Sequence, residues 1–153
     1  MIVFKSKKFN ELTTKELLDI MELRSEVFVV EQNCVYQDID GKDHEAIHII
    51  GFNDQKKIIA YSRILAKGNA YLEYPAIGRI VVSPKSRGKK IGHRLLDISL
   101  QKTEELYPKE TIKISAQSHL VPFYNTHGFT SIGEEYLEDG IPHIGMEIIK
   151  NKS

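Results

Sequence analysis

The hydrophobic and polar residues of the chain follow two different periods, which together predict an α/β fold. Short runs rich in β-branched and aromatic residues predict strands, whereas apolar residues spaced three or four apart predict amphipathic helices. The predicted strands are residues 2–6, 46–52, 57–66, 76–82, 111–116, 129–137 and 143–149. The predicted helices are residues 13–32, 88–107 and 120–126, with an acidic loop at 37–43.

Capping and turn residues support these boundaries. Thr13-Thr14-Lys15-Glu16 has the form of a capping box, and Pro108 stops the long helix. Asn53-Asp54-Gln55 and Asp139-Gly140 are favoured turn sequences, each between two strands that we expect to pair antiparallel. The strand–loop–helix–strand unit at 77–116 must cross over and run parallel, which places its loop at a carboxyl edge of the sheet. We therefore expect a mixed sheet with helices on its faces.

Length and composition restrict the class of protein. The 153 residues match one domain spanning 1–153, and equal numbers of basic and acidic residues remove the main driving force for nucleic-acid binding. No apolar run approaches the ~20 residues that span a bilayer, and the first ten residues lack the apolar core of a secretory signal. The single Cys34 excludes an internal disulfide and favours a cytoplasmic protein. Its thiol is either a small core group or a catalytic one.

Positive charge is concentrated where the strand at 76–82 leads into the next helix. Residues 85–94 include five lysines or arginines and no acid. The N–H groups of such a loop and of the first helical turn lack helical partners, and the helix dipole adds positive potential. We therefore predict a site for a phosphorylated ligand. The order Gly88-Lys89-Lys90-Ile91-Gly92 fits neither the dinucleotide motif nor the P-loop, and a solvated basic turn is the alternative.

The sequence contains two near matches to metal motifs. His44-Glu45 with His48 misses the H-E-x-x-H spacing by one residue. Asp38-Ile39-Asp40-Gly41 fails the EF-hand order and has Ile49 where the loop requires glutamate. We therefore assign no metal.

Two further motifs resemble those of the GNAT superfamily of N-acetyltransferases. The pattern [Gln/Arg]-x-x-Gly-x-[Gly/Ala] is matched by Arg87, Gly92 and the preceding strand, and Phe-Tyr-x-x-x-Gly-Phe is matched in full by residues 123–129. Three more segments resemble the ElaA-like branch of this superfamily. They are residues 27–32, 119–124 and 136–143.

The resemblance implies a mostly antiparallel central sheet and direct transfer of an acetyl group from acetyl-CoA, the cosubstrate, to an amine of a small molecule or peptide. It also implies which residues hold the cosubstrate. These are Ile80, Val81, Val82, Arg87, Gly88, Lys89, Lys90, Ile91, Gly92, His93, Gln117 and Tyr124. Lys90 replaces the first glycine of the family pattern, so we expect helical backbone there. Gln117 replaces an asparagine of many relatives, with the same donor and acceptor on a longer stem.

The chemistry of the transfer requires a base, an oxyanion site and an acid. A lysine-like amine has a pKa of ~10.4 and must lose a proton, for which Glu31, Asp38 and His119 are the candidates. A backbone N–H near Val81 or Val82 is the expected oxyanion donor. Tyr124 occupies the motif position that relatives use to protonate the departing thiolate. The alternative is that Tyr124 is a packed helix residue.

Candidate acceptor-binding residues are Arg24, Arg79 and, by family analogy, His143, with Glu73 just before the strand of Arg79. Arg24 and Glu31 are equally interpreted as a solvated pair, and His143 as a surface residue of the last hairpin. A monomer and a homodimer both fit the sequence. Beside the transferase, two hypotheses stay open: a non-catalytic module that binds or senses acyl-CoA, and an interaction protein with an inert pocket.

Overall fold

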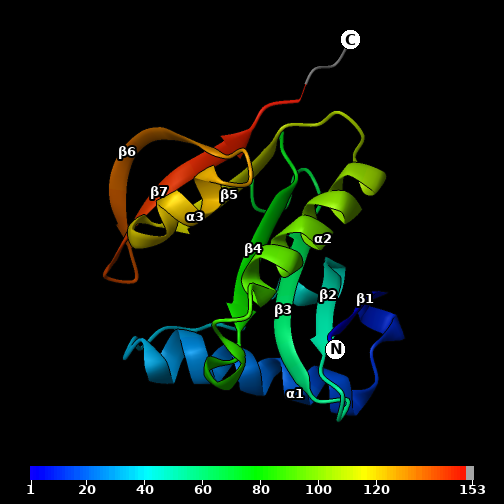
Figure 1. Cartoon of the computed structure of the whole chain (residues 1–153). Helices are drawn as coiled ribbons and strands as arrows, with labels where there is room; N and C mark the ends of the chain where they lie inside the picture. The colour runs from blue at the N-terminus through cyan, green and yellow to red at the C-terminus, as the bar shows by residue number, and fades with distance from the viewer. Residues whose placement is uncertain (151–153) are drawn as a thin grey trace.

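A computed structural model describes residues 1–150 as one seven-stranded sheet with helices on both faces (Figure 1). The strands are β1 Val3–Lys8, β2 Ile47–Phe52, β3 Ile58–Leu65, β4 Ala76–Val82, β5 Ile112–Gln117, β6 Thr130–Glu138 and β7 Ile141–Ile148. The helices are α1 Thr14–Arg24, α2 Ile91–Leu106 and α3 Val121–Asn125. These elements confirm the predicted order, with boundaries shifted by at most a few residues.

The sheet has the strand order β1-β2-β3-β4-β5-β7-β6, and every neighbouring pair is antiparallel except β4 and β5. Helix α2 connects these two parallel strands. This confirms the predicted mixed, mostly antiparallel sheet with one parallel strand–loop–helix–strand unit. The ladder between β4 and β5 contains a single pair, Ala76 with Lys113, after which the strands diverge (Figure 1). One edge of β4 is thereby open to a ligand.

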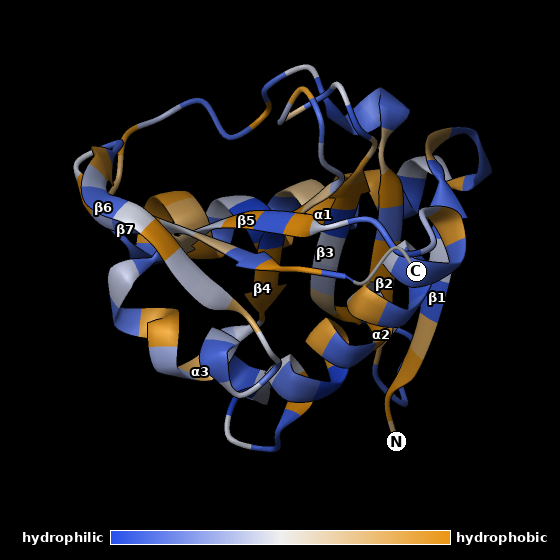
Figure 2. Ribbon diagram, turned by 90° about the horizontal axis from the view of Figure 1, so that it is seen from above, coloured by the Kyte–Doolittle hydropathy of each residue, from blue (hydrophilic) through white to orange (hydrophobic). Residues whose placement is uncertain are grey.

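Two apolar clusters hold the helices to opposite faces of the sheet. Helix α1 and the segment after it pack Ile20, Leu23 and Val27 against β2, β3 and β4. On the other face, α2 contributes Leu95 and Leu96 to a larger core that also includes α3 and the C-terminal strands. Figure 2 shows the sheet between α1 on one side and α2 and α3 on the other. None of the helices within residues 1–150 is long and apolar enough to span a bilayer.

Strand β4 contains a bulge where it passes the centre of the sheet. Tyr61 and Arg63 of β3 pair with Val81 and Gly78, so β4 uses one more residue than its partner over this stretch. Arg79 lies within the bulge and has the positive φ of 51°. The extra residue reverses the alternation of side chains along β4. Accordingly, Ile77 joins the α2 core and Val81 joins the α1 core.

The first predicted helix begins where its capping box predicts. The Thr13 side chain accepts a hydrogen bond from the Glu16 N–H, and the Glu16 carboxylate accepts one from the Thr13 N–H. After Arg24 the chain stays helical but widens into a π-helical segment, Ser25–Glu31. The predicted range 13–32 thus covers two kinds of helix. Such π-helical turns are frequent at functional sites.

Helix α2 begins three residues later than predicted, because Lys90 is left-handed with φ 59° and ψ 21°. The expectation of helical backbone at Lys90 is therefore wrong. The basic loop reverses direction before it joins the helix axis, and left-handed residues at Gly88 and Lys90 produce this turn. Burial of the next side chain, Ile91, helps to offset the cost of the left-handed lysine.

The turn between β6 and β7 confirms the predicted hairpin. Asp139 and Gly140 both have positive φ, 52° and 79°, as a type I′ turn requires. This turn brings the ends of β6 and β7 next to the carboxyl end of β5. Gln117, His143 and Tyr136 consequently lie in one cross-strand row.

Candidate functional site

A cleft of about 1590 Å³ lies where β4 and β5 diverge. Its walls are the basic loop and the start of α2, helix α3, the segment from the π-helix through residue 42, and the tip of the β6–β7 hairpin. It brings together most of the site residues expected from the sequence. These are Glu31, Arg79, Ile80, Val81, Val82, Arg87, Gly88, Lys90, Ile91, Gly92, His93, Gln117, His119, Tyr124 and His143. Lys89, Arg24, Asp38 and Glu73 do not line it.

The basic loop forms an anion cradle at one end of this cleft. Helix α2 has no side-chain cap at Lys90, so the N–H groups of its first turn are available to a ligand. The left-handed residues Gly88 and Lys90 reorient further backbone N–H groups of the preceding loop. Successive N–H groups arranged in this way form anion-binding concavities. Arg87 and Lys90 add positive charge to the lining. The site therefore suits a diphosphate.

Arg87 joins this cradle to the π-helical segment. Its two terminal nitrogens each donate a 2.7 Å hydrogen bond to one carboxylate oxygen of Glu31, and its Nε donates to the carbonyl of Val82 at 3.2 Å. The hydrogen bonds and charge of Arg87 hold the pKa of Glu31 below its usual value. Because a carboxylate with a lowered pKa is a weaker base, this pairing bears directly on the role expected for Glu31.

Tyr124 lies on α3 with its ring buried between Phe123 and Phe129, which it meets edge to face. The residue lines the cleft. Burial raises the pKa of Tyr124 to about 12. The phenol is therefore protonated at neutral pH. Gln117, at the end of β5, accepts a 3.4 Å hydrogen bond from the Gln32 side chain.

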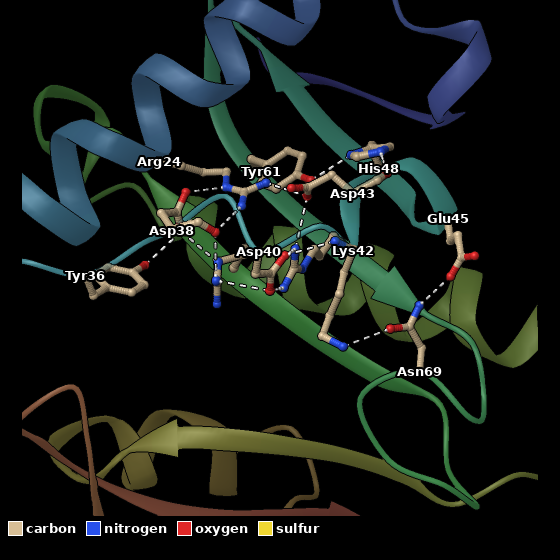
Figure 3. Close-up of polar contacts among 12 residues, drawn as sticks. Arg24, Tyr36, Asp38, Asp40, Lys42, Asp43, Glu45, His48, Tyr61 and Asn69 are labelled. Atoms are coloured by element: carbon tan, nitrogen blue, oxygen red, sulfur yellow. Dashed lines mark hydrogen bonds and ion pairs between the residues drawn. The ribbon is translucent and has the colours of Figure 1, made fainter.

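A buried ionic network fixes the wall on the α1 side (Figure 3). The Arg24 side chain is 0 % exposed, with Nε donating to Asp38 at 2.8 Å and Nη1 to Asp43 at 2.6 Å. Arg24 thus points away from the cleft and holds the acidic loop to α1. The interpretation of Arg24 and Glu31 as a solvated pair is wrong, because each has another partner.

The same network reaches the cleft through Arg63 and Arg79. Arg63 donates to Asp40 at 2.6 Å and 2.8 Å and to Asp43 at 3.1 Å. At the β4 bulge, Arg79 Nε lies 2.7 Å from Asp38 Oδ1, and Nη2 donates to the Asp38 carbonyl at 2.9 Å. Burial opposes ionisation of Asp40 and Asp43, but the neighbouring arginines outweigh it and lower the pKa of both carboxyls.

His48 and Tyr61 complete this network beneath the sheet surface. His48 Nε2 donates to the carbonyl of Asp43 at 2.9 Å, and Nδ1 accepts from the Tyr61 hydroxyl at 2.6 Å (Figure 3). Burial lowers the pKa of His48. The sequence did not predict Asp43, Arg63, His48 and Tyr61 as residues that form the site. The only sequence signal was their placement in otherwise apolar strands or in the acidic loop.

The opposite wall consists of polar side chains from the last three strands. The Ser115 hydroxyl hydrogen bonds to Tyr136 and lies 3.2 Å from Glu138 Oε1. His143 stacks on Tyr136, and its Nδ1 lies 2.7 Å from the Ile141 carbonyl. His143 is 7 % exposed, so the interpretation as a surface histidine is wrong.

The other expected bases differ in their surroundings. His119 is exposed at the rim of the cleft. Asp38 is buried and already engaged by Arg24, Arg79 and the Tyr36 hydroxyl. Within residues 1–150, no cluster of three or more histidine, cysteine or acidic side chains has a geometry that fits a metal ion.

Comparison with known proteins gives concordant likenesses over nearly the whole chain. A family model described as an acetyltransferase (GNAT) domain matches residues 10–150. Protein ElaA of Escherichia coli K12 is 43% identical over 148 residues, 95% of each chain. The crystal structure of E. coli ElaA superposes with a TM-score of 0.90 at 41% identity, covering 97% of this chain and 99% of that one. An acyl-CoA N-acyltransferase from Pseudomonas aeruginosa gives 0.91 at 40% identity with the same coverage.

Proposed function

The chain belongs to the GNAT acetyltransferase family, and on that premise we propose that it transfers an acetyl group from acetyl-CoA directly to an amine nitrogen of a small molecule or peptide. The observation that carries the proposal is the unpaired edge of β4, which has an anion cradle at one end and the Tyr124 hydroxyl nearby. A free Cys34 fits a reducing compartment, and we propose the cytoplasm.

In this proposal, the cradle holds the diphosphate of acetyl-CoA. The donors are the N–H groups of Gly88, Lys90 and the first turn of α2, and the side chains of Arg87 and Lys90 supply charge. The dipole of a 16-residue helix adds to their attraction. A diphosphate is recognised here by backbone geometry more than by any single side chain.

The pantetheine arm extends from the cradle along the open edge of β4, beside Ile80, Val81 and Val82. An extended arm with amides adds to an unpaired strand edge as a further strand does. Gln117 faces this edge from β5 and offers both a donor and an acceptor. The thioester carbonyl then lies beside a β4 N–H near Val81 or Val82, which stabilises the oxyanion.

Tyr124 assists departure of the CoA thiolate. The amine nitrogen forms a bond to the carbonyl carbon, the carbon–sulfur bond breaks, and the sulfur leaves with the electron pair. A phenol with a pKa of about 12 is a weaker acid than a thiol of pKa ~8.5. Tyr124 therefore stabilises the thiolate by donating a hydrogen bond, and complete proton transfer follows from solvent.

The attacking amine must lose one proton, and the cleft offers several acceptors. Glu31 and His119 both line it, as the sequence predicted. Glu31 serves as a base only after Arg87 leaves it, since the ion pair occupies both carboxylate oxygens. His119 reaches the amine only through water from the rim.

The test is release of thiol from acetyl-CoA in the presence of an amine panel, with mass-spectrometric detection of the acetylated product. Lys90→Glu places a negative charge in the cradle and is expected to weaken acetyl-CoA binding at least tenfold. Lys56→Glu is the matched control, because Lys56 is also left-handed, with φ 61°, and lies outside the cleft. Calorimetry measures both variants.

Two outcomes contradict the proposal. Binding of acetyl-CoA without turnover on any amine indicates the non-catalytic acyl-CoA-binding module. Absence of binding by the wild-type protein indicates an interaction protein with an inert pocket.

A further inference from the structure

We propose that Ser115, Tyr136, Glu138 and His143 form the acceptor subsite, which binds a positively charged primary amine through Glu138 and deprotonates it at Nε2 of His143. This inference rests on the proposed transferase function. It identifies the class of acceptor and the base.

The placement of these residues follows from the sheet. In β5 and β7 one face packs Ile114, Ala116 and Met146 into the core with α2 and α3. The other face presents polar side chains to the cleft. Gln117 pairs with His143 across β5 and β7, and His143 pairs with Tyr136 across β7 and β6. Since Gln117 adjoins the proposed path of the pantetheine, this row begins beside the thioester.

The orientation of the His143 ring determines which of its two nitrogens can accept a proton. Its Nδ1 lies 2.7 Å from the carbonyl oxygen of Ile141, which accepts hydrogen bonds and never donates them. The neutral ring therefore carries its hydrogen on Nδ1 and has a lone pair on Nε2. Among residues 1–150, no group donates a hydrogen bond to Nε2. Stacking on Tyr136, with centroids 6.2 Å apart, fixes the ring plane.

Glu138 supplies the negative charge that recognises the amine. Its Oε1 accepts from Ser115 at 3.2 Å, and its Oε2 lies 3.5 Å from Nε2 of His143. No lysine or arginine within residues 1–150 pairs with it, whereas Glu31 across the cleft is held by Arg87. The Glu138 side chain is 47% exposed, so an incoming ammonium reaches it without displacing a buried cation.

Aromatic side chains complete the subsite around an alkyl chain. Tyr36 and Tyr71 line the same cleft as Tyr136. Tyr71 is half-buried, and its burial, together with the nearby Tyr136 and Glu138, raises its pKa. Aromatic faces favour cations and their methylene neighbours. The cleft lining also includes the titratable side chains of Cys34, Lys42 and Asp139, and the guanidinium groups of Arg63 and Arg79, which are paired with Asp40 and Asp38.

Deprotonation of the bound ammonium precedes its attack on the thioester. The ammonium donates hydrogen bonds to Glu138 and loses one proton to Nε2 of His143. The nitrogen lone pair attacks the thioester carbon, and the nitrogen, which now carries a positive charge, releases its second proton to solvent as the carbon–sulfur bond breaks. Tyr124 donates a hydrogen bond to the departing thiolate, which then takes up one proton from solvent, so that acetylation of one ammonium releases one proton overall. The imidazolium formed on His143 lies beside the Glu138 carboxylate, which stabilises it, and then returns its proton to solvent.

The first experiment measures kcat and KM for His143→Gln, which keeps an amide to bond the Ile141 carbonyl but cannot take a proton. We expect kcat to fall at least 100-fold and the acidic limb of the kcat/KM pH profile to disappear, with acetyl-CoA affinity unchanged by calorimetry. His44→Gln, at an exposed histidine outside the cleft, is the matched control and is expected to behave as wild type.

The second experiment tests recognition of charge. Glu138→Gln is expected to raise the KM of a cationic alkylamine at least tenfold while leaving that of an arylamine, which is uncharged at neutral pH, within twofold. Glu134→Gln, on the same strand and outside the cleft, is its control. This variant keeps the proposal testable if His143→Gln does not fold.

The outcomes separate the inference from the transferase function. Wild-type turnover with an unchanged pH profile in His143→Gln overturns the inference alone, as does loss of the acidic limb in Glu31→Gln or His119→Gln instead. An equal rise in KM for both amines in Glu138→Gln overturns the recognition of charge. Absence of turnover by the wild-type protein overturns the transferase function and the inference with it.

Discussion

The guanidinium of Arg87 and the carboxylate of Glu31 face each other with both nitrogen–oxygen pairs at 2.7 Å. This contact joins the loop of the anion cradle to the π-helical segment that follows α1. A diphosphate in the cradle competes with Glu31 for the same guanidinium. Partly exposed pairs of this kind contribute about 0–1 kcal/mol, so the competition is small but measurable.

Glu31→Gln is accordingly expected to tighten acetyl-CoA binding by about twofold to fivefold, because Arg87 is released to the diphosphate. Arg87→Gln is expected to weaken it. Calorimetry at low and moderate salt measures both, and the effects are expected to shrink as salt rises. Unchanged affinity in Glu31→Gln would show that Arg87 keeps its partner when acetyl-CoA binds.

Tyr124→Phe removes one hydroxyl from a residue that lines the cleft. We expect turnover to fall about 10-fold to 100-fold, since the thiolate loses a hydrogen-bond donor. Acetyl-CoA affinity and the melting temperature are expected to stay nearly unchanged. Steady-state kinetics, calorimetry and thermal melting check the three parts, and wild-type turnover in the variant contradicts the role of Tyr124.

Arg24→Met breaks the centre of the buried ionic network. Removing one partner of a buried pair costs about 3–5 kcal/mol, and here Asp38 and Asp43 each lose one of their two arginine partners and keep only Arg79 and Arg63. Urea unfolding is expected to show this loss. Lys15→Met is the matched control, since Lys15 pairs with Asp19 on the exposed face of α1, where solvent screens the pair, and its loss is expected to change stability little. Equal decreases in the free energy of unfolding of the two variants would contradict the assignment of Arg24 to the buried ionic network.

The free energy of unfolding is expected to decrease in two stages as the pH falls. Burial lowers the pKa of His48, so its contribution is present above the unfolded value of ~6.5 and is lost as pH falls through the lower folded value. The arginine partners lower the pKa values of Asp40 and Asp43, so that contribution is present above ~3.9 and is lost at lower pH.

Thermal melting between pH 8 and pH 3 measures this profile. His48→Gln is expected to reduce the first decline and to leave the second, whereas His44→Gln is expected to keep both. Superimposable profiles for these two variants would mean that another group produces the first decline.

Lys90→Gly and Lys90→Val separate charge from backbone conformation at the start of α2. Both remove the same cation, but only glycine adopts φ 59° without steric cost. We expect Lys90→Gly to melt at or slightly above the wild-type temperature. Lys90→Val is expected to lose at least about 1 kcal/mol. Equal melting temperatures contradict the left-handed assignment.

Local patterns in the sequence were sufficient to predict most of the fold. The capping box at Thr13, the Asp139-Gly140 turn and the run from strand to basic loop each depend on neighbouring residues, and each appears in the structure. The conformation of Lys90 was not predictable from its residue type. It follows from the direction in which the loop enters the helix.

The contacts that form the two walls of the cleft could not be predicted from the sequence. Arg24 finds its partners in the acidic loop, and Arg63 joins them from β3, so no spacing within one element reveals the network. Glu138 and Ser115 meet only after β6 and β5 are assembled around β7. The cradle is local in sequence, whereas the two walls of the cleft are assembled from segments that are distant in sequence.

The bulge at Arg79 sets which side chains of β4 face each side of the sheet. Deleting one residue at the bulge would restore the regular alternation of side chains along β4. It would also turn every side chain of β4 after Arg79 to the opposite face of the sheet. Val81 would then point toward α2, and its neighbour Val82 toward α1, so both cores would receive the wrong surface. A change of one residue in length within β4 therefore exchanges the buried faces of the strand, so the length of this strand is fixed by both cores at once.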